Sequence, residues 1–216
     1  MPFDLAQTDK LLTTTRAVRK RLDLTREVPR DVILDCIRIS QQAPTGSNMQ
    51  GWRWLVVGDA DKKRALAELY GKAGADYLEQ GRKQAQESGH VQTARVLDSA
   101  VYLVEHLHEV PYLVIPCLKG ALPPGTPSAM TAGFFGSIYP AVWSFQLALR
   151  SRGLGTVLTT LHLAHAEEAA KLLDIPEGVT QCGLLPVAYT IGDEFKPADR
   201  RPPEHITSWD SWQAQK

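Results

Sequence analysis

Positive charge is concentrated near the start of the chain, where the run Arg16–Arg21 (RAVRKR) holds four basic side chains in six residues. Arginine binds phosphate through planar, charge-assisted pairs of hydrogen bonds, so this run suits a phosphorylated ligand. A solvated basic turn is the alternative, because most charge runs lie on the surface. The run is the first candidate for a binding site.

A second candidate is the segment 43–52 (APTGSNMQGW), which is rich in small and polar residues. Small side chains allow the backbone to approach a ligand closely. Asn48 and Gln50 each carry hydrogen-bond donors and an acceptor, which the polar edge of a heteroaromatic ring requires. An ordinary turn between a helix and a strand would have a similar composition.

Two further segments are less specific when each is taken alone. The segment 153–160 (GLGTVLTT) contains paired glycines, but it leaves a predicted helix and enters a predicted strand, so it is not a GxGxxG dinucleotide-binding motif. The segment 200–203 (RRPP) has the composition of a basic linker.

Taken together and in this order, the four segments resemble the nitroreductase family of flavin mononucleotide (FMN)-dependent oxidoreductases. Segment 43–52 is similar to the family motif Ala-Pro-Ser-x-x-Asn-x-Gln-Pro-Trp, with Thr45 in place of the serine and Gly51 in place of the proline. The family's Gly-Leu-Gly-Thr motif matches residues 153–156, and Arg201 matches a basic residue before a proline-containing tail. The resemblance extends over essentially the whole chain.

The resemblance implies an FMN site shared by the two subunits of a homodimer. Arg16 and Arg19, joined by the tail arginines, would hold the phosphate and the polar edge of the ring. The loop that begins at Pro44 would line the ring from the other subunit, and backbone groups of 158–161 would reach the reactive nitrogen N5. The implied cofactor contacts are Arg16, Ala17, Val18, Arg19, Pro44, Thr45, Gly46, Asn48, Leu158, Thr159, Thr160, Leu161, Arg200 and Arg201.

This sequence departs from the family pattern at several of these positions. Ala17 stands where a serine is common, and Thr159 and Thr160 fall in a stretch that often has an acidic residue. Arg21 takes a position that is often aromatic, so its role is open.

The activity implied by the resemblance is that of an FMN-dependent NAD(P)H oxidoreductase. NADH or NADPH would donate a hydride to flavin N5 in a ping-pong scheme, and a nitroaromatic, quinone or similar small electron-poor acceptor would then be reduced. The flavin would carry the chemistry, so no catalytic side chain is assigned. Residues 70–107 and 130–139 would form the pocket walls, with Phe134 and Tyr139 as candidate substrate contacts.

Three alternatives remain beside this activity. The first is a specialised family member, such as a dehalogenase, an ene-reductase or a flavin-modifying enzyme. The second is a flavin-binding protein without catalytic activity. The third is a site of another kind, but Ser47 and Ser137 lack the pattern of a hydrolase nucleophile, and the histidines lack the spacing of metal ligands. We expect no metal.

The periodicity of apolar residues predicts the elements that position these segments. Helices are expected over 31–43, after Asp59 with Leu66 and Leu69 inward, through the stretch that ends near Leu107, along the stripe from Phe135 to Leu149, and over 166–173. Strands are expected over 52–57, 112–117, 155–160 and 182–191, and a loop over 120–128.

This order predicts an α+β fold, a three-layer α/β/α sandwich with a mixed, mainly antiparallel sheet of about four to five strands flanked by helices. The chain would form a single domain over 1–216, with the long central helix at the dimer interface. Trp209 and Trp212 lie in the otherwise polar region 192–216, which we therefore expect to pack on the partner subunit as a C-terminal extension.

The composition limits the partners and the compartment. A formal net charge of zero argues against non-specific binding to nucleic acid or to a membrane. The three cysteines, Cys36, Cys117 and Cys182, are widely spaced and are expected to be reduced, buried thiols. With no recognisable signal peptide and no long apolar run, a cytoplasmic location is expected.

Overall fold

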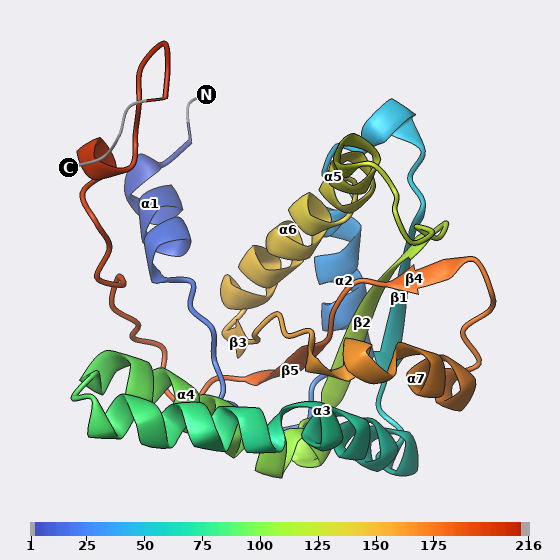
Figure 1. Cartoon of the computed structure of the whole chain (residues 1–216), viewed down its shortest axis with the longest axis horizontal. Helices are drawn as coiled ribbons and strands as arrows, with labels where there is room; N and C mark the ends of the chain where they lie inside the picture. The colour runs from blue at the N-terminus through green and yellow to red at the C-terminus, as the bar shows by residue number, and fades with distance from the viewer. Residues whose placement is uncertain (1–2, 213–216) are drawn as a thin grey trace.

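The structure, a computed structural model, describes residues 3–212, and its middle layer is a five-stranded sheet (Figure 1). The strands are β1 (Trp52–Val57), β2 (Tyr112–Lys119), β3 (Leu154–Gly155), β4 (Val179–Gln181) and β5 (Leu185–Tyr189). The order is β1-β2-β5-β3, with β4 also paired to β2, and all these pairs are antiparallel. The predicted mainly antiparallel sheet is confirmed.

Strand β2 explains why the chain needs helices on both sides of the sheet. Leu113 and Ile115 point into one buried cluster, whereas Val114 and Leu118 point into another. Successive side chains of a strand face opposite sides, so an uninterrupted apolar strand must be covered on both faces.

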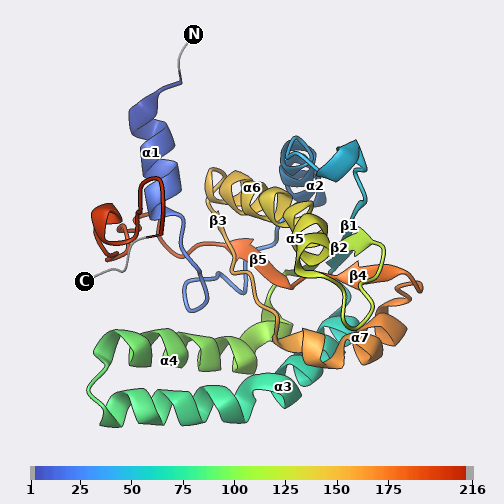
Figure 2. The same ribbon diagram turned by 45° about the horizontal axis from the view of Figure 1, so that its top comes forward.

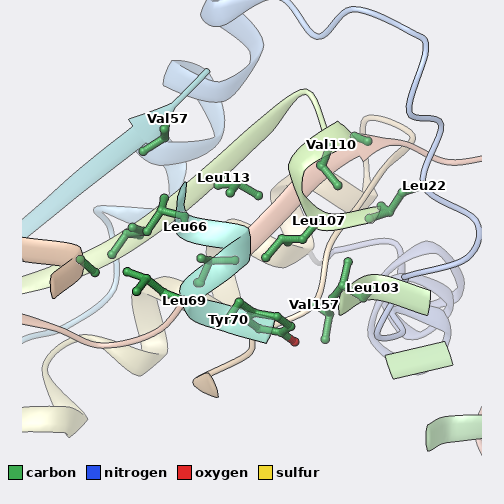
Figure 3. Packing of buried hydrophobic residues seen from close by; sticks show 14 of the residues in the cluster. Leu22, Val57, Leu66, Leu69, Tyr70, Leu103, Leu107, Val110, Leu113 and Val157 are labelled. Carbon is green, nitrogen blue, oxygen red and sulfur yellow. The ribbon is translucent and has the colours of Figure 1, made fainter. Parts of the chain in front are cut away.

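All of the long helices except α1, which projects from the domain, lie in the two outer layers (Figure 2). The helices are α1 (Leu5–Thr14), α2 (Arg30–Ser40), α3 (Ala60–Glu87), α4 (Val91–His106), α5 (Ser128–Gly136), α6 (Tyr139–Arg150) and α7 (Ala166–Leu173), with short 3-10 helices at η1 (Gly46–Asn48), η2 (Leu107–Glu109), η3 (Leu161–His165) and η4 (Pro203–His205). Residues of α3, α4 and α7 build the cluster drawn in Figure 3, and residues of α2 and α6 build the other. The predicted three-layer α+β sandwich is confirmed.

Helix α3 begins where the sequence predicted. The Asp59 side chain accepts hydrogen bonds from the backbone N–H groups of Asp61 and Lys62, at 3.1 and 2.9 Å. These bonds satisfy donors that a helix N-terminus otherwise leaves unpaired. Leu66 and Leu69 are buried, as expected.

The stripe from Phe135 to Leu149 is not one helix, which corrects the prediction. Helix α5 ends at Gly136 and α6 begins at Tyr139. Pro140 supplies the physical reason, because a proline ring clashes with the carbonyl group four residues earlier and cannot lie inside a continuous helix. At the first turn of a new helix the same proline is tolerated.

The strand predicted over 155–160 is also shorter than expected. Only Leu154 and Gly155 pair as a strand, and beyond them Thr156 and Thr159 form isolated bridges with Ala17 and Leu184. The segment changes its pairing partner within a few residues, so no regular ladder can develop.

The strand predicted over 182–191 is limited to β5, which retains Pro186 in its interior. Strand β3 pairs only with Ala188 and Tyr189, so the missing N–H of Pro186 leaves no gap in that ladder.

Helix α1, which the sequence did not predict, and the end of the chain project together from the body of the domain (Figures 1 and 2). Trp209 and Trp212 are 76% and 90% exposed. Packing of this extension on a partner remains a prediction, and residues 1–2 and 213–216 of the predicted domain lie outside the described residues. No helix within residues 3–212 has the length and apolar character needed to span a membrane.

Candidate functional site

The cationic segment, Arg16–Arg21, lines a cleft of about 490 Å³. The opposite wall is formed by Glu194, Phe195 and Lys196, at the start of the C-terminal region. Two parts of the chain that are distant in sequence therefore meet at one open, positively charged cavity.

Arg16 and Arg19 use few of their donors within the protein. In the described part of the chain, Arg16 donates only to the backbone oxygen of Lys196 at 3.1 Å, and Arg19 only to Ser99 Oγ at 3.3 Å. Burial lowers the pKa of the Arg19 guanidinium. A partly buried guanidinium without a carboxylate partner favours an anionic ligand.

The other two cations of the segment are occupied by the chain itself. Arg21 donates to the carbonyl oxygens of Ile191 and Glu194, both at 2.8 Å, and its guanidinium lies 4.0 Å from the centre of the Phe195 ring. Lys20 forms an ion pair with Asp98 at 2.5 Å. The open role of Arg21 is therefore structural in this chain, since it fixes residues 191–195 against the domain.

The Gly-Leu-Gly-Thr motif holds the cationic segment in place. The backbone N–H of Val18 donates to the carbonyl of Thr156 at 2.9 Å. A Cβ atom on Gly155 would lie 2.7 Å from a methyl group of Thr190 and 3.0 Å from Val18, closer than real contacts allow. Only glycine permits this approach, which explains the second glycine of the motif.

The 158–161 segment follows the Gly-Leu-Gly-Thr motif, and some of its backbone N–H groups are unpaired. The N–H and C=O of Thr159 pair with Leu184, at 3.0 and 2.8 Å, so the Thr159 N–H is not available to a ligand. Within residues 3–212 the N–H groups of Leu158 and Thr160 have no acceptor, and both side chains are exposed. These two donors could meet an acceptor on a bound ring.

The Pro44–Gln50 loop is exposed and has an unusual backbone. Ser47, Asn48 and Gln50 all have positive φ angles, of 51°, 53° and 48°. Such angles are costly for residues with side chains and cluster at functional sites. The N–H of Gly46 donates to Ser137 Oγ at 3.1 Å, which fixes the loop beside the start of α6.

The cationic segment and this loop lie at opposite ends of α6 (Figure 1). Ser137 precedes the first residue of α6, whereas Arg150, the last, stacks on Phe195 in the cationic cleft at 4.6 Å. Twelve helical residues span about 18 Å, so α6 separates the two predicted binding elements within one chain.

The predicted substrate contacts lie at the loop end of α6. Phe135 packs edge-on against Phe134 and stacks on Tyr139, with ring centres 5.3 and 5.6 Å apart. The Tyr139 hydroxyl donates to the carbonyl of Cys182 at 3.2 Å. Phe135 packs partly against the core, and α5 and α6 together carry this aromatic group.

The tail arginines are not brought to the cationic cleft of their own chain by any contact within residues 3–212. Among the described residues, Arg200 donates only to the neighbouring carbonyl of Asp199, at 3.1 Å, and Arg201 is exposed. Their predicted role would need a different neighbour, such as a second copy of the chain.

The remaining ionisable candidates have structural roles. His162 is fully buried, its ring nitrogens have no hydrogen-bond partner in the described part of the chain, and burial lowers its pKa to about 4. All three cysteines are buried and unbridged, as expected. Residues 3–212 contain no group of three or more side chains suited to a metal ion.

Tyr70 and Ser99 fall within the broad range 70–107 expected to form pocket walls, but neither was predicted as an individual contact, and Phe195 was not predicted at all. Tyr70 lies on the apolar face of α3, where a core role is the ordinary expectation. Ser99 and Phe195 belong to no recognised motif, and only the fold brings them beside the arginines.

Comparison with known proteins places this geometry in a family. The nitroreductase family model matches residues 12–189. The chain is 29% identical over 178 residues to an iodotyrosine deiodinase of Danio rerio, covering 81% of this chain and 57% of that protein, so it spans little more than half of the relative's length. It is 27% identical over 199 residues to an iodotyrosine deiodinase of Thermotoga neapolitana, covering 91% of each protein.

Solved structures agree with the sequence relatives. A crystal structure of oxidised iodotyrosine deiodinase bound to FMN and 3-iodo-L-tyrosine superposes with a TM-score of 0.71 at 25% identity, covering 94% of this chain and 99% of that one. Nitroreductase A from Vibrio parahaemolyticus shares the fold, with a TM-score of 0.70 at 14% identity over 97% of this chain and 77% of that one. By its family match and its fold, this chain belongs to the nitroreductase family.

Proposed function

We propose that this protein is an FMN-dependent oxidoreductase that removes a halogen reductively from an aromatic substrate. The observation that carries the proposal is the full-length similarity to an iodotyrosine deiodinase, which covers 91% of both proteins. A dehalogenase was one of the alternatives raised by the sequence, and these relatives favour it over the general reduction of nitroaromatics or quinones.

The residues present suit FMN. Arg16 and Arg19 have unpaired guanidinium donors beside an open cleft, which fits a phosphate or the polar edge of a ring. The unpaired N–H groups of Leu158 and Thr160 fit an acceptor on the ring. In the described part of the chain these donors lie on neighbouring segments, because Val18 is bonded to Thr156.

When bound, FMN supplies the electron chemistry, and the protein binds, orients and tunes it. Overall, two electrons and one proton replace a carbon–halogen bond with a carbon–hydrogen bond, and a halide ion leaves. The arginines would stabilise negative charge on the reduced ring. The N–H groups of Leu158 and Thr160 would fix the orientation of its reactive edge.

We further propose that two copies of the chain complete each site. In one chain the cationic segment and the Pro44–Gln50 loop lie at opposite ends of α6, whose twelve residues span about 18 Å (Figure 1). The outer face of α6 leaves Tyr139 and Trp143 exposed, and the tail exposes Trp209 and Trp212. Exposed aromatic residues of this kind are typical of protein interfaces.

The activity can be tested directly with the reduced holoprotein. Protein reconstituted with FMN is reduced with dithionite without oxygen and mixed with 3-iodo-L-tyrosine, a nitroaromatic or a quinone in separate reactions. We expect flavin re-oxidation together with iodide release from the first compound. Re-oxidation by the nitroaromatic or quinone alone would instead favour the general reductase activity, with NADH or NADPH as the donor.

The shared site can be tested by mixing two defective chains. Arg19→Ala damages the cationic segment and Gly46→Phe blocks the loop, so each variant alone should retain little FMN. Co-refolded chains should recover about a quarter of the native sites, because half of the dimers are mixed and each has one intact site. Absence of recovery, with both variants folded and dimeric, would contradict a shared site.

A further inference from the structure

Two residues on one face of helix α3, Tyr70 and Gly74, lie against the 158–161 segment. The Tyr70 hydroxyl lies 3.0 Å from Thr159 Oγ1. One helical turn later, a Cβ atom on Gly74 would lie only 2.4 Å from a methyl carbon of Leu161, so this glycine leaves a notch for the leucine. Residues four apart share a helix face, and Thr160 lies between the two points of contact.

Tyr70 is held rigidly and remains a neutral phenol. Its ring is 2% exposed and packs in the cluster with Leu66 and Leu69, and Figure 3 shows its hydroxyl oxygen pointing away from Leu69. Burial raises the pKa of Tyr70, and the Thr159 hydrogen bond and the charge of Arg19 only partly oppose this. The phenol therefore keeps its proton and can donate to Thr159.

The same phenol also lies in the electrostatic range of Arg19. Burial lowers the pKa of Arg19, and only a deprotonated Tyr70 would oppose this shift. The observed contact of the Tyr70 hydroxyl is with Thr159 in the 158–161 segment, which we assign to FMN together with the cationic segment.

We propose that Tyr70 is a positioning residue for the flavin, which acts by fixing Thr159 and so the direction of the neighbouring N–H groups. This role rests on the proposed FMN site. Thr159 faces Tyr70 and pairs with Leu184, whereas Leu158 and Thr160 on either side are exposed and their N–H groups are unpaired in the described part of the chain. Loss of the hydroxyl frees the Thr159 side chain to rotate and leaves only the backbone pair with Leu184 to fix the direction of both donors.

The experiment compares Tyr70→Phe, Thr159→Val and the double variant, each reconstituted with FMN. The FMN reduction potential is measured by anaerobic spectroscopic titration, and the dissociation constant of oxidised FMN by titration of the apoprotein. We expect each single variant to change the ratio of reduced to oxidised FMN affinity by about three- to tenfold, the scale of one hydrogen bond. The double variant should match the singles, because both remove the same bond.

Two controls separate positioning from general stability. Tyr112→Phe removes a hydroxyl from a half-buried tyrosine of β2, outside the expected pocket walls, and should leave the potential unchanged. Thr159→Ser keeps the hydroxyl and should restore the wild-type potential. A lower melting temperature for Tyr70→Phe with an unchanged potential and FMN affinity would reduce Tyr70 to a packing residue and overturn the inference.

The FMN-binding measurements give different results if the proposed function is wrong and if only the role of Tyr70 is wrong. Wild-type protein that binds no FMN would overturn the proposed function and the positioning role together. Wild-type protein that binds FMN, with Tyr70→Phe and Thr159→Val both indistinguishable from it, would overturn only the role of Tyr70. If Tyr70→Phe does not fold, the comparison of Thr159→Val with Thr159→Ser tests the same bond from its other side.

Discussion

The cationic segment and the Pro44–Gln50 loop, both assigned to one cofactor, are built in opposite ways. The first is anchored by its own chain, through the Val18 bond to Thr156 and the stacking of Arg21 on Phe195. The second is exposed, and three of its non-glycine residues have positive φ. The fold fixes the cationic segment before a ligand binds, whereas the Pro44–Gln50 loop has a strained backbone and is exposed to solvent.

This difference indicates which part of a cofactor site has to be fixed in position before the ligand binds. Guanidinium groups must be positioned before a phosphate arrives, because unsupported long side chains lose rotamer entropy on binding. A strained loop persists only where surrounding structure determines its conformation, and here Ser137 supplies one contact on one side. We therefore expect perturbations of the anchored side to have larger effects than perturbations of the loop.

The largest expected effect is a loss of stability in acid through His162, which directly follows the 158–161 segment. The folded pKa of about 4 lies below the usual value of 6.5, so the unfolded chain binds more protons between these values. The free energy of unfolding should therefore fall as the pH drops from about 6.5 to about 4, by up to about 3 kcal/mol from this group. Urea unfolding across this range, compared with His162→Gln, isolates the contribution, and parallel curves for the two proteins would refute it.

Loss of a guanidinium from the anchored side should weaken FMN binding. Arg19→Ala is expected to cost about 1.5–3 kcal/mol of FMN affinity, the scale of a hydrogen bond to a charged group. Titration of the apoprotein with FMN measures the change. Arg64→Ala, which removes an exposed arginine paired with Asp61, serves as the control and should bind FMN normally.

Replacing Gly155, which packs closely against Thr190 and Val18, tests how the Gly-Leu-Gly-Thr motif holds the cationic segment in place. The Cβ atom of Gly155→Ala would collide with Thr190 and Val18, so we expect a destabilisation of about 1–3 kcal/mol, as for other overpacked sites. FMN retention should fall as well, because Val18 adjoins Arg19. Gly133→Ala, in a helix where a Cβ meets nothing within 4 Å, is the matched control, and an equal loss in both would contradict the role of the anchor.

The smallest expected effect lies in the loop. Ser47 has φ of 51°, which glycine adopts without steric cost, so Ser47→Gly should raise the free energy of unfolding by less than about 1 kcal/mol. Chemical unfolding measures this change. A clear loss of stability would show that the serine contributes more than its backbone strain costs, and would weaken the contrast between the two regions.

Local patterns predicted many elements well. Asp59 before a helical stretch and the unbroken apolar run of β2 are local features, and each element formed where its residues favoured it. Local patterns failed where a neighbour in space decided the outcome, as in the segment after Gly155, which bridges first to Ala17 and then to Leu184. Pro140 is a local signal for the break before α6. The prediction missed this break because it gave more weight to the apolar periodicity around the proline.

The site was predicted as a set of motifs, but not as an arrangement. The types and order of residues in the cationic segment, the Pro44–Gln50 loop and the Gly-Leu-Gly-Thr motif indicated the family, because binding a phosphorylated ring limits which residues suit these positions. The resemblance set Arg21 apart only as a position that is often aromatic, and it did not predict that Arg21 stacks on Phe195 while Arg19 keeps unpaired donors.

The sequence by itself determined the family and the chemical types at the site, since these depend on side-chain identity and short spacing. Only the tertiary structure decided which arginines remain free for a ligand, that Tyr70 lies against Thr159, and that α6 separates the two binding elements. These outcomes depend on contacts between residues distant in the chain, and such contacts are set by how the helices pack on the sheet and not by any local preference.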